Sequence, residues 1–200
     1  LFFFFLFALS AIIAIRRTQI ETHEQTLDEN SVRDYIDSFL LEARRREASD
    51  ASPSTFTREM LAGNVQGFLA AGIETVRTSL EWALLTLAAY PDVQKKMYNE
   101  LSQVCPGDEP TALVYTQAVI LEIERWKTIS PLNLMRMTTA ECTLNGVHIP
   151  KGMHVIANLW AVHFDPTYWS QPHQFNPERF IDIDKQLIKH SRFIPFSLGK

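Results

Sequence analysis

The chain has 200 residues, of which 46% are hydrophobic and 21% are charged. This balance is enough to bury a real core and excludes a disordered protein, so we expect one domain or a large part of one. The formal net charge of −4 argues against a nucleic-acid partner, because phosphate binding needs concentrated lysine and arginine. Two cysteines, Cys105 and Cys142, are too few for a disulfide framework and indicate a reducing compartment.

The first 15 residues, LFFFFLFALSAIIAI, are almost wholly apolar and are followed by Arg16 and Arg17. A spanning helix needs about 18 or more such residues, and a signal peptide carries basic residues before its apolar run. We therefore favour a buried or membrane-surface helix. A truncated anchor and a faulty gene model are the alternatives, and the composition of the run does not decide among them.

Four further helices are predicted from apolar spacing and helix-end signals. Ser31 is expected to cap the first, whose apolar residues between Val32 and Ala43 recur at helical spacing. Residues 57–90 contain no proline, which predicts an unusually long second helix. Two shorter helices are expected from Pro91 to about Val104 and over residues 116–128.

The middle of the long helix has almost no side-chain bulk at Ala70, Ala71 and Gly72, and Gly72 costs a helix about 1 kcal/mol relative to alanine. Glu74 and Thr75 follow this gap directly. On its own, the better interpretation is that the Thr75 hydroxyl bonds back to a carbonyl one turn earlier while Glu74 faces water. The functional alternative is a ligand in the gap, with a hydroxyl and a carboxyl at its edge able to pass protons.

Beyond Ser130 the pattern changes from helix to strand. Residues 143–149, with Asn145-Gly146 at their centre, predict a hairpin with a tight turn. A second turn is expected at Lys151-Gly152 and another strand at Val155-Ile156, before a mostly irregular C-terminal section. The predicted fold class is mainly α with a small β portion.

Glu122 and Arg125 lie three residues apart on the last predicted helix and therefore share one face. The simple interpretation is a solvated ion pair, worth about 0.3 to 0.5 kcal/mol. The two residues nevertheless flank an apolar arc that includes Val119 and Ile123, so they border the core. A charge pair in that position needs further hydrogen bonds to offset its desolvation, and a second arginine would supply them.

Other chemistries find little support in the sequence. His148 and His154 flank a turn, but none of the six histidines has the spacing of a zinc site, so no metal ligand is predicted. The sequence contains neither a phosphate-cradling glycine loop nor a Gly-x-Ser-x-Gly elbow. Kinase and hydrolase functions are therefore not favoured.

Seven short motifs, each weak singly but specific in this order, resemble the cytochrome P450 family and its microsomal animal branch. They are Ala71-Gly72-x-Glu74-Thr75, Tyr90-Pro91-Asp92-Val93-Gln94, Glu122-x-x-Arg125, Leu144-Asn145-Gly146 with Ile149-Pro150-Lys151-Gly152, Asn158-Leu159-Trp160-Ala161 before Asp165-Pro166, Phe175-Asn176-Pro177-Glu178-Arg179-Phe180, and Phe193 to Lys200. The resemblance implies a partial cytochrome P450 fold in one incomplete domain over residues 1–200. Residues 20–200 match the family, whereas residues 1–19 are an apolar segment without a clear counterpart.

The resemblance also implies roles for individual residues. Glu74 and Thr75 are the implied catalytic pair: Thr75 would hydrogen-bond the oxygen substrate or its water, while Glu74 feeds protons. Val76 stands where the family usually has a second hydroxyl residue. Ala71 and Gly72 are implied to bind the haem cofactor.

Further implied residues lie in the second half of the chain. Arg136 stands where the family places a basic residue against a haem propionate, and Phe196 and Gly199 belong to the loop that leads to the haem ligand. Arg179 is implied to be the second arginine that Glu122 and Arg125 require. Together these three would form a buried structural triad that fixes the loop beneath the haem.

The implied function is that of a haem-thiolate monooxygenase, which inserts one oxygen atom of O2 into an apolar small molecule. Electrons would come from NADPH through a partner reductase, at the cytoplasmic face of the endoplasmic reticulum membrane. The axial cysteine is expected shortly after Lys200, and neither Cys105 nor Cys142 is suited to replace it. The alternative is a truncated, inactive product that binds little or no haem; a helical interaction module would explain none of the ordered motifs.

Overall fold

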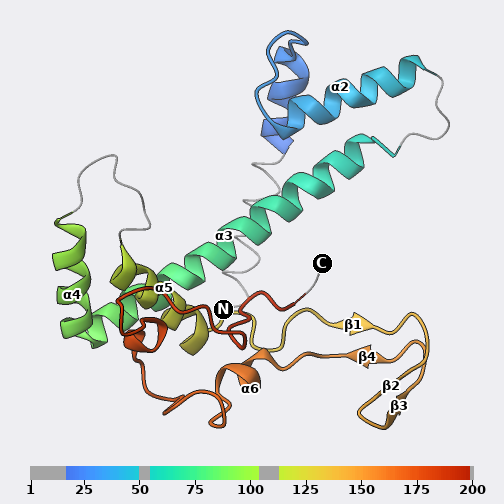
Figure 1. The fold of residues 1–200 in the computed structure, drawn as a ribbon. Helices are drawn as coiled ribbons and strands as arrows, with labels where there is room; N and C mark the ends of the chain where they lie inside the picture. The colour runs from blue at the N-terminus through green and yellow to red at the C-terminus, as the bar shows by residue number, and fades with distance from the viewer. Residues whose placement is uncertain (1–16, 50–54, 104–112, 199–200) are drawn as a thin grey trace, which may run out of the picture. The chain divides into compact units, whose positions relative to one another are not determined.

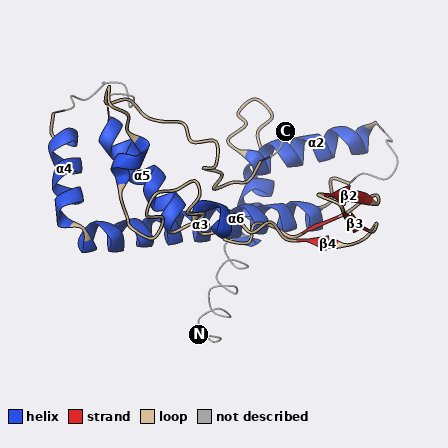
Figure 2. Ribbon diagram, turned by 60° about the horizontal axis from the view of Figure 1, so that its bottom comes forward, coloured by secondary structure: helices blue, strands red, loops and turns tan. Residues whose placement is uncertain are grey.

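The computed structural model describes residues 17–49, 55–103 and 113–198. Helices predominate and the strands are short, which confirms the predicted mainly α fold with a small β portion (Figure 2). The chain divides after Val76 into two compact units, and each is described by itself. The apolar opening run to Ile15 lies outside the described residues. Among the helices that are described, none offers an apolar stretch of the length needed to cross a bilayer.

The first unit comprises helical residues 17–26, α2 (Tyr35–Ala48) and the beginning of α3 (Arg58–Ala89), as Figure 1 shows in blue to green. Apolar side chains from these three segments form one core cluster. Its buried members are Ile20, Ile36, Phe39, Leu61 and Val65.

The start of α2 differs from the prediction. Asp34, not Ser31, is the N-cap, and its carboxylate accepts hydrogen bonds from the backbone N–H groups of Ile36 and Asp37. Arg33 explains the later start, because its backbone N–H and its guanidinium both bond to the Asp37 carboxylate and so hold the chain extended before the helix. The guanidinium lowers the pKa of Asp37 to about 2.

The long helix is confirmed, since α3 extends over 32 residues from Arg58 to Ala89. In the second unit α4 (Pro91–Leu101) begins with a proline, whose missing N–H costs nothing in the first turn. Next in the sequence is α5 (Val114–Trp126), which has no capping side chain of its own at Leu113. Both shorter helices were predicted: α4 begins at Pro91 as expected and ends about three residues earlier, and α5 begins and ends two residues earlier than expected.

Two antiparallel strand pairs follow α5 (Figure 1). The predicted hairpin is confirmed as β2 (Cys142–Leu144) and β3 (Val147–Ile149), and both turn residues, Asn145 and Gly146, have positive φ angles of 49° and 81°. This conformation is the type I′ geometry that Asn-Gly favours. The other pair joins β1 (Arg136–Met137) to β4 (His154–Val155), one residue before the predicted strand.

The C-terminal section contains little regular structure, namely the short helix α6 (Leu159–His163) and the 3-10 helix η2 (Pro177–Phe180). It is nevertheless held firmly against α5 by large apolar side chains. Trp169 and Phe180 pack with Ala118, and Phe175 packs with Val119 and Ile123. One face of α5 thus forms the core of the second unit.

Candidate functional site

Glu122 lies at the centre of the polar contacts in the second unit. Its side chain is completely buried, and its carboxylate accepts hydrogen bonds from Arg125 Nε and Nη2 at 2.7 and 2.8 Å. The same carboxylate accepts a third hydrogen bond from Arg179 Nε at 3.0 Å. The interpretation of Glu122 and Arg125 as a solvated pair is therefore wrong. We call Glu122, Arg125 and Arg179 the Glu122 cluster.

Arg125 also donates hydrogen bonds to the backbone. Nη1 donates to the carbonyl oxygen of His163 at 2.7 Å, and Nη2 also donates to that of Pro172 at 2.9 Å. The rings of Phe164 and Trp169 lie 5.3 Å from the guanidinium carbon, within the range of a cation–π contact. A fully buried guanidinium is tolerable here because each partner is an acceptor or the face of a ring.

Arg179 extends the cluster toward the C-terminal section. Its Nη1 donates to the carbonyl oxygen of Ser170 at 2.9 Å, and its Nη2 donates to that of Gln174 at 3.1 Å. The backbone N–H of Asn176 donates to the Glu122 carboxylate at 2.9 Å. Two guanidiniums, one carboxylate and several carbonyl oxygens therefore fix a segment that has almost no secondary structure of its own.

The helix that carries Glu122 and Arg125 receives its cap from a different helix. Glu100, on the last turn of α4, accepts hydrogen bonds from the backbone N–H groups of Tyr115 and Thr116 at 2.8 and 2.7 Å. The carboxylate both satisfies two N–H groups that lack helical partners and complements the positive end of the helix dipole. The sequence analysis missed Glu100, because a cap 15 residues away leaves no local signal.

The predicted catalytic pair lies on α3 in the first unit. The Thr75 hydroxyl donates a hydrogen bond to the carbonyl oxygen of Ala71 at 2.7 Å, which is the local contact that the sequence favoured. Glu74 is exposed, and a Cβ atom added to Gly72 would meet no atom within 4 Å. The roles of Ala71, Gly72, Glu74 and Thr75 toward a ligand stay predictions.

The other predicted cofactor-binding residues are in the second unit. Arg136 is exposed on β1, opposite Val155 of β4. Phe196 is 82% exposed and Leu198 is 75% exposed, so both apolar side chains project from the C-terminal loop without being covered. Gly199 lies outside the described residues.

The loop before Gly199 is a tight turn. The backbone N–H of Ser197 donates to the carbonyl oxygen of Ile194 at 2.9 Å, with Pro195 in the second position, which is where β-turns favour proline. Ser197 has a φ of 69°, in the left-handed region that non-glycine residues seldom occupy. Such strain is typically retained where function requires a particular backbone shape.

His163 was not predicted as a site residue. Its side chain is completely buried at the end of α6, and its Nε2 accepts a hydrogen bond from the backbone N–H of Ile194 at 3.1 Å. Burial, and secondarily the charge of Arg125, lowers the pKa of His163 to about 4. The available signal was a histidine inside the apolar run Leu159–Phe164, which indicates a buried ring.

Possible metal ligands come together once among the described residues, where His23, Asp34 and Asp37 approach one another. The Arg33 guanidinium occupies both carboxylate oxygens of Asp37 at 2.7 Å, and its positive charge opposes a cation at this place. The other cysteine and histidine residues considered as metal ligands do not form a cluster among the described residues. Cys142, His148 and His154 are exposed on separate strands, and Cys105 lies outside the described residues.

Comparison with known proteins identifies the family. The model of the family described as "Cytochrome P450" matches residues 6–200. The chain is 37% identical over 187 residues to Cytochrome P450 2U1 of Bos taurus, an alignment that covers 90% of this chain and 34% of the relative. It is 38% identical over 187 residues to Cytochrome P450 2J2 of Homo sapiens, with 90% and 37% covered.

The chain therefore spans about a third of the length of these curated relatives. Both relatives are mammalian, in agreement with the resemblance to the animal branch. The ordered motifs, the mainly α fold and the match over residues 6–200 are consistent with one another, and the chain belongs to the cytochrome P450 family.

Proposed function

We propose that this chain is part of a haem-thiolate monooxygenase, which inserts one oxygen atom of O2 into an apolar small molecule. Family membership implies haem as the cofactor and a redox partner that supplies electrons from NADPH. The observation that carries the proposal is the buried Glu122 cluster, because it immobilises residues 163–179 ahead of the strained turn at Ile194–Ser197. A rigid support of this kind is what a metal-ligand loop requires.

The residues present fit a haem. In the first unit, a Cβ atom added to Gly72 would meet no atom within 4 Å, so the α3 backbone is accessible there. Considered separately, Phe196 and Leu198 of the second unit expose apolar surface that suits a flat macrocycle. Arg136 is an exposed cation suited to a propionate. By family relationship, the iron ligand is proposed to be a cysteine shortly after Lys200. Cys142 is exposed on the β2–β3 hairpin.

The chain's own contribution to the chemistry is proposed to be proton handling by Thr75 and Glu74. When bound, thiolate-ligated haem supplies the electron density that favours O–O cleavage. The Thr75 hydroxyl donates a hydrogen bond to the Ala71 carbonyl oxygen, so toward a ligand its oxygen acts as an acceptor. Rotation about the Cβ–Oγ1 bond would redirect the hydroxyl hydrogen from the Ala71 carbonyl to a bound ligand, and the exposed Glu74 is the proposed proton source.

The Glu122 cluster is proposed to fix the loop on which the thiolate depends. The described hydrogen bonds of Arg125 and Arg179 end on Glu122 and on backbone carbonyls, so the cluster binds protein groups. Its contribution is therefore geometric. A ligand that is held rigidly keeps its distance to iron and excludes competing ligands.

The test is the spectrum of the reduced carbon monoxide complex of the full-length gene product. Thiolate-ligated haem should give a Soret band shifted to long wavelength. A band typical of histidine ligation, or no haem at all, would rule the assignment out. Product formation should further depend on a NADPH-dependent reductase, on O2 and on an apolar substrate.

A second candidate function can be tested for the 200 residues by themselves: an inactive product that binds little or no haem. It is favoured by the thiols available as iron ligands. The thiol that the structure describes, Cys142, is exposed on a hairpin strand and not near residues 193–198 in the sequence. Haem titration of the purified 200-residue chain separates the candidates. Tight, stoichiometric binding would contradict the second candidate.

The subcellular location is proposed from the relationship to other cytochromes P450. Membership of the microsomal animal branch favours the membrane of the endoplasmic reticulum, with the catalytic domain on the cytoplasmic face and in contact with the membrane surface. Fractionation of cells that express the tagged full-length protein tests this location. Recovery with the microsomal membranes is expected, and protease added to sealed microsomes should cleave a domain exposed on the cytoplasmic side.

A further inference from the structure

His163 makes two hydrogen bonds with different partners through different parts of the residue. Its backbone carbonyl oxygen accepts the bond from Arg125 Nη1 at 2.7 Å, while its ring Nε2 accepts the bond from the Ile194 backbone N–H at 3.1 Å. Arg125 belongs to the Glu122 cluster, and Ile194 is the first residue of the turn that ends at Ser197. One residue therefore contacts both the cluster and the turn.

The ring is held in place from several sides. It is completely buried and lies parallel to the ring of Phe193, with 5.9 Å between centroids and 21° between planes. Phe193 in turn packs edge-on against Phe180, which is itself fully buried. This packing restricts the orientation of the His163 ring. The hydrogen bond from the Ile194 N–H to Nε2 therefore has a fixed direction.

The protonation state of the ring follows from its partner. A backbone N–H is a donor, so Nε2 must present a lone pair and the ring must be neutral, with its proton on Nδ1. Burial and the neighbouring Arg125 lower the pKa of His163 to about 4, which keeps that tautomeric form neutral at physiological pH. Among the described residues, Nδ1 has no hydrogen-bond partner. A buried donor without an acceptor lowers the free energy of unfolding, so Nδ1 of His163 is a destabilising feature.

We propose that His163 is a positioning residue, which couples the Glu122 cluster to the turn at Ile194–Ser197 and so sets where the thiolate loop begins. This inference rests on the proposed function. It goes beyond that function because it assigns the position of the Ile194 backbone to the His163 ring and not to the Glu122 cluster alone. Loss of the ring acceptor should loosen the turn even though the His163 carbonyl still binds Arg125.

The test uses two variants of the full-length protein. His163→Leu keeps an apolar side chain and the backbone carbonyl but removes the acceptor for the Ile194 N–H. His163→Gln places an amide oxygen close to the position of Nε2 and should restore the acceptor. His173→Leu is the matched control, because His173 is exposed and its ring lies tilted against that of Phe164. Its backbone carbonyl, which accepts a bond from Trp126, is kept in the variant.

The first measurement is hydrogen–deuterium exchange. In His163→Leu the peptide covering residues 193–198 should exchange about tenfold faster than in wild type, while α5 is unchanged, because one local hydrogen bond is lost. His163→Gln and His173→Leu should match wild type. Equal acceleration in α5, or none at residues 193–198, would overturn the inference.

The second measurement is the fraction of the reduced carbon monoxide complex that shows the thiolate-shifted Soret band. His163→Leu should lower this fraction, and His163→Gln should restore most of it. If both variants lose the band equally, or if neither does, the ring acceptor has no positioning role. A wild-type protein without the shifted band would instead refute the proposed function, and with it this inference.

Discussion

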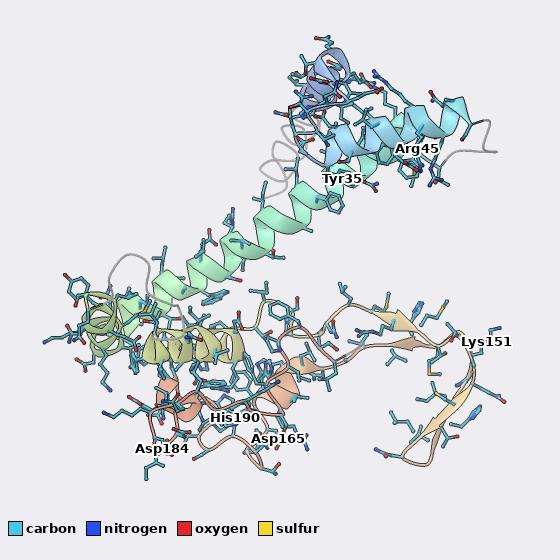
Figure 3. The ribbon with its side chains drawn as sticks, turned by 45° about the horizontal axis from the view of Figure 1, so that its top comes forward. Tyr35, Arg45, Lys151, Asp165, Asp184 and His190 are labelled. Atoms are coloured by element: carbon cyan, nitrogen blue, oxygen red, sulfur yellow. The ribbon has the colours of Figure 1, made fainter. Side chains whose placement is uncertain are left out.

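Arg179 Nε lies 3.0 Å from the Glu122 carboxylate, although 57 residues separate the two along the chain. This contact joins η2 to α5 and completes a carboxylate that two guanidiniums share. Figure 3 shows the side chains of the surrounding C-terminal segment, with Asp165 and His190 labelled. The ring of His190 contacts Trp169 and Phe180, so apolar packing surrounds the buried charges.

Glu122→Gln should be strongly destabilising. It leaves the completely buried Arg125 without a counter-charge, and breaking one partner of a buried ion pair costs about 3 to 5 kcal/mol of unfolding free energy. Urea unfolding followed by circular dichroism measures the loss. Glu81→Gln is the control, because the Arg77–Glu81 pair is more than half exposed and should contribute less than about 1 kcal/mol. Similar losses in both variants would contradict the importance of burial.

Arg179→Lys keeps the positive charge but removes the planar fork. Nε donates to Glu122 while Nη1 and Nη2 donate to the carbonyl oxygens of Ser170 and Gln174, which a single ammonium cannot reproduce. We expect a loss of about 1.5 to 3 kcal/mol, since hydrogen bonds to charged groups carry that magnitude. The thermal unfolding midpoint should fall accordingly. A lysine variant as stable as wild type would mean that charge alone matters here.

Glu100→Ala should destabilise α5, although Glu100 itself belongs to α4. The two N–H groups of Tyr115 and Thr116 would lose their acceptor, and the loss of a helix cap costs about 0.5 to 2 kcal/mol. Asn99→Ala, at an exposed neighbouring position on the same helix, is the control and should be nearly neutral. Chemical denaturation of the two variants side by side measures the difference, and equal midpoints would show that the cap is dispensable.

Stability should decrease with acid as His163 becomes protonated in the unfolded chain. Its pKa in the folded protein is about 4 against an ordinary value of 6.5, so between these values the unfolded state binds more protons. The stabilisation is complete above pH 6.5 and is lost as the pH falls toward 4. The loss of unfolding free energy amounts to at most about 3 kcal/mol at pH 4.

The measurement for this prediction is the free energy of unfolding as a function of pH in wild type and in His163→Gln. On acidification from pH 6.5 to pH 4, wild type should lose unfolding free energy relative to His163→Gln, because the histidine titrates in this range and the glutamine does not. The ring is packed beside the charged Arg125, which opposes protonation in the same direction as burial. Parallel curves would show that His163 is not the titrating group.

Thr75→Ala should uncouple electron consumption from product formation in the full-length enzyme. Removing the hydroxyl removes a proton-relay group and slows proton delivery, so peroxide release relative to product should rise severalfold. Thr75→Ser retains the hydroxyl and should remain coupled. Peroxide, product and NADPH consumption are measured together. Unchanged coupling in the alanine variant would refute the relay role.

The sequence by itself determined the local elements and the family. Helical spacing and the proline at position 91 located α3 and α4, and Asn145-Gly146 determined the β2–β3 hairpin, because these signals act within a few residues. It failed at the start of α2, where Arg33 and Asp37 favour Asp34 over Ser31 as the cap. The ordered motifs led to the cytochrome P450 family, which the match over residues 6–200 shows.

Only the tertiary structure decided which polar groups share the core. The contact of Glu122 with Arg179 was implied by the family resemblance, whereas the contacts of Glu100 with the start of α5 and of His163 with Ile194 were not. These two contacts join residues 15 and 31 positions apart. Such pairings follow from how Trp169, Phe175 and Phe180 pack on α5, and no local periodicity encodes them. Burial then gives these hydrogen bonds their importance, because a charged or polar group removed from water is stable only when its partners are in place.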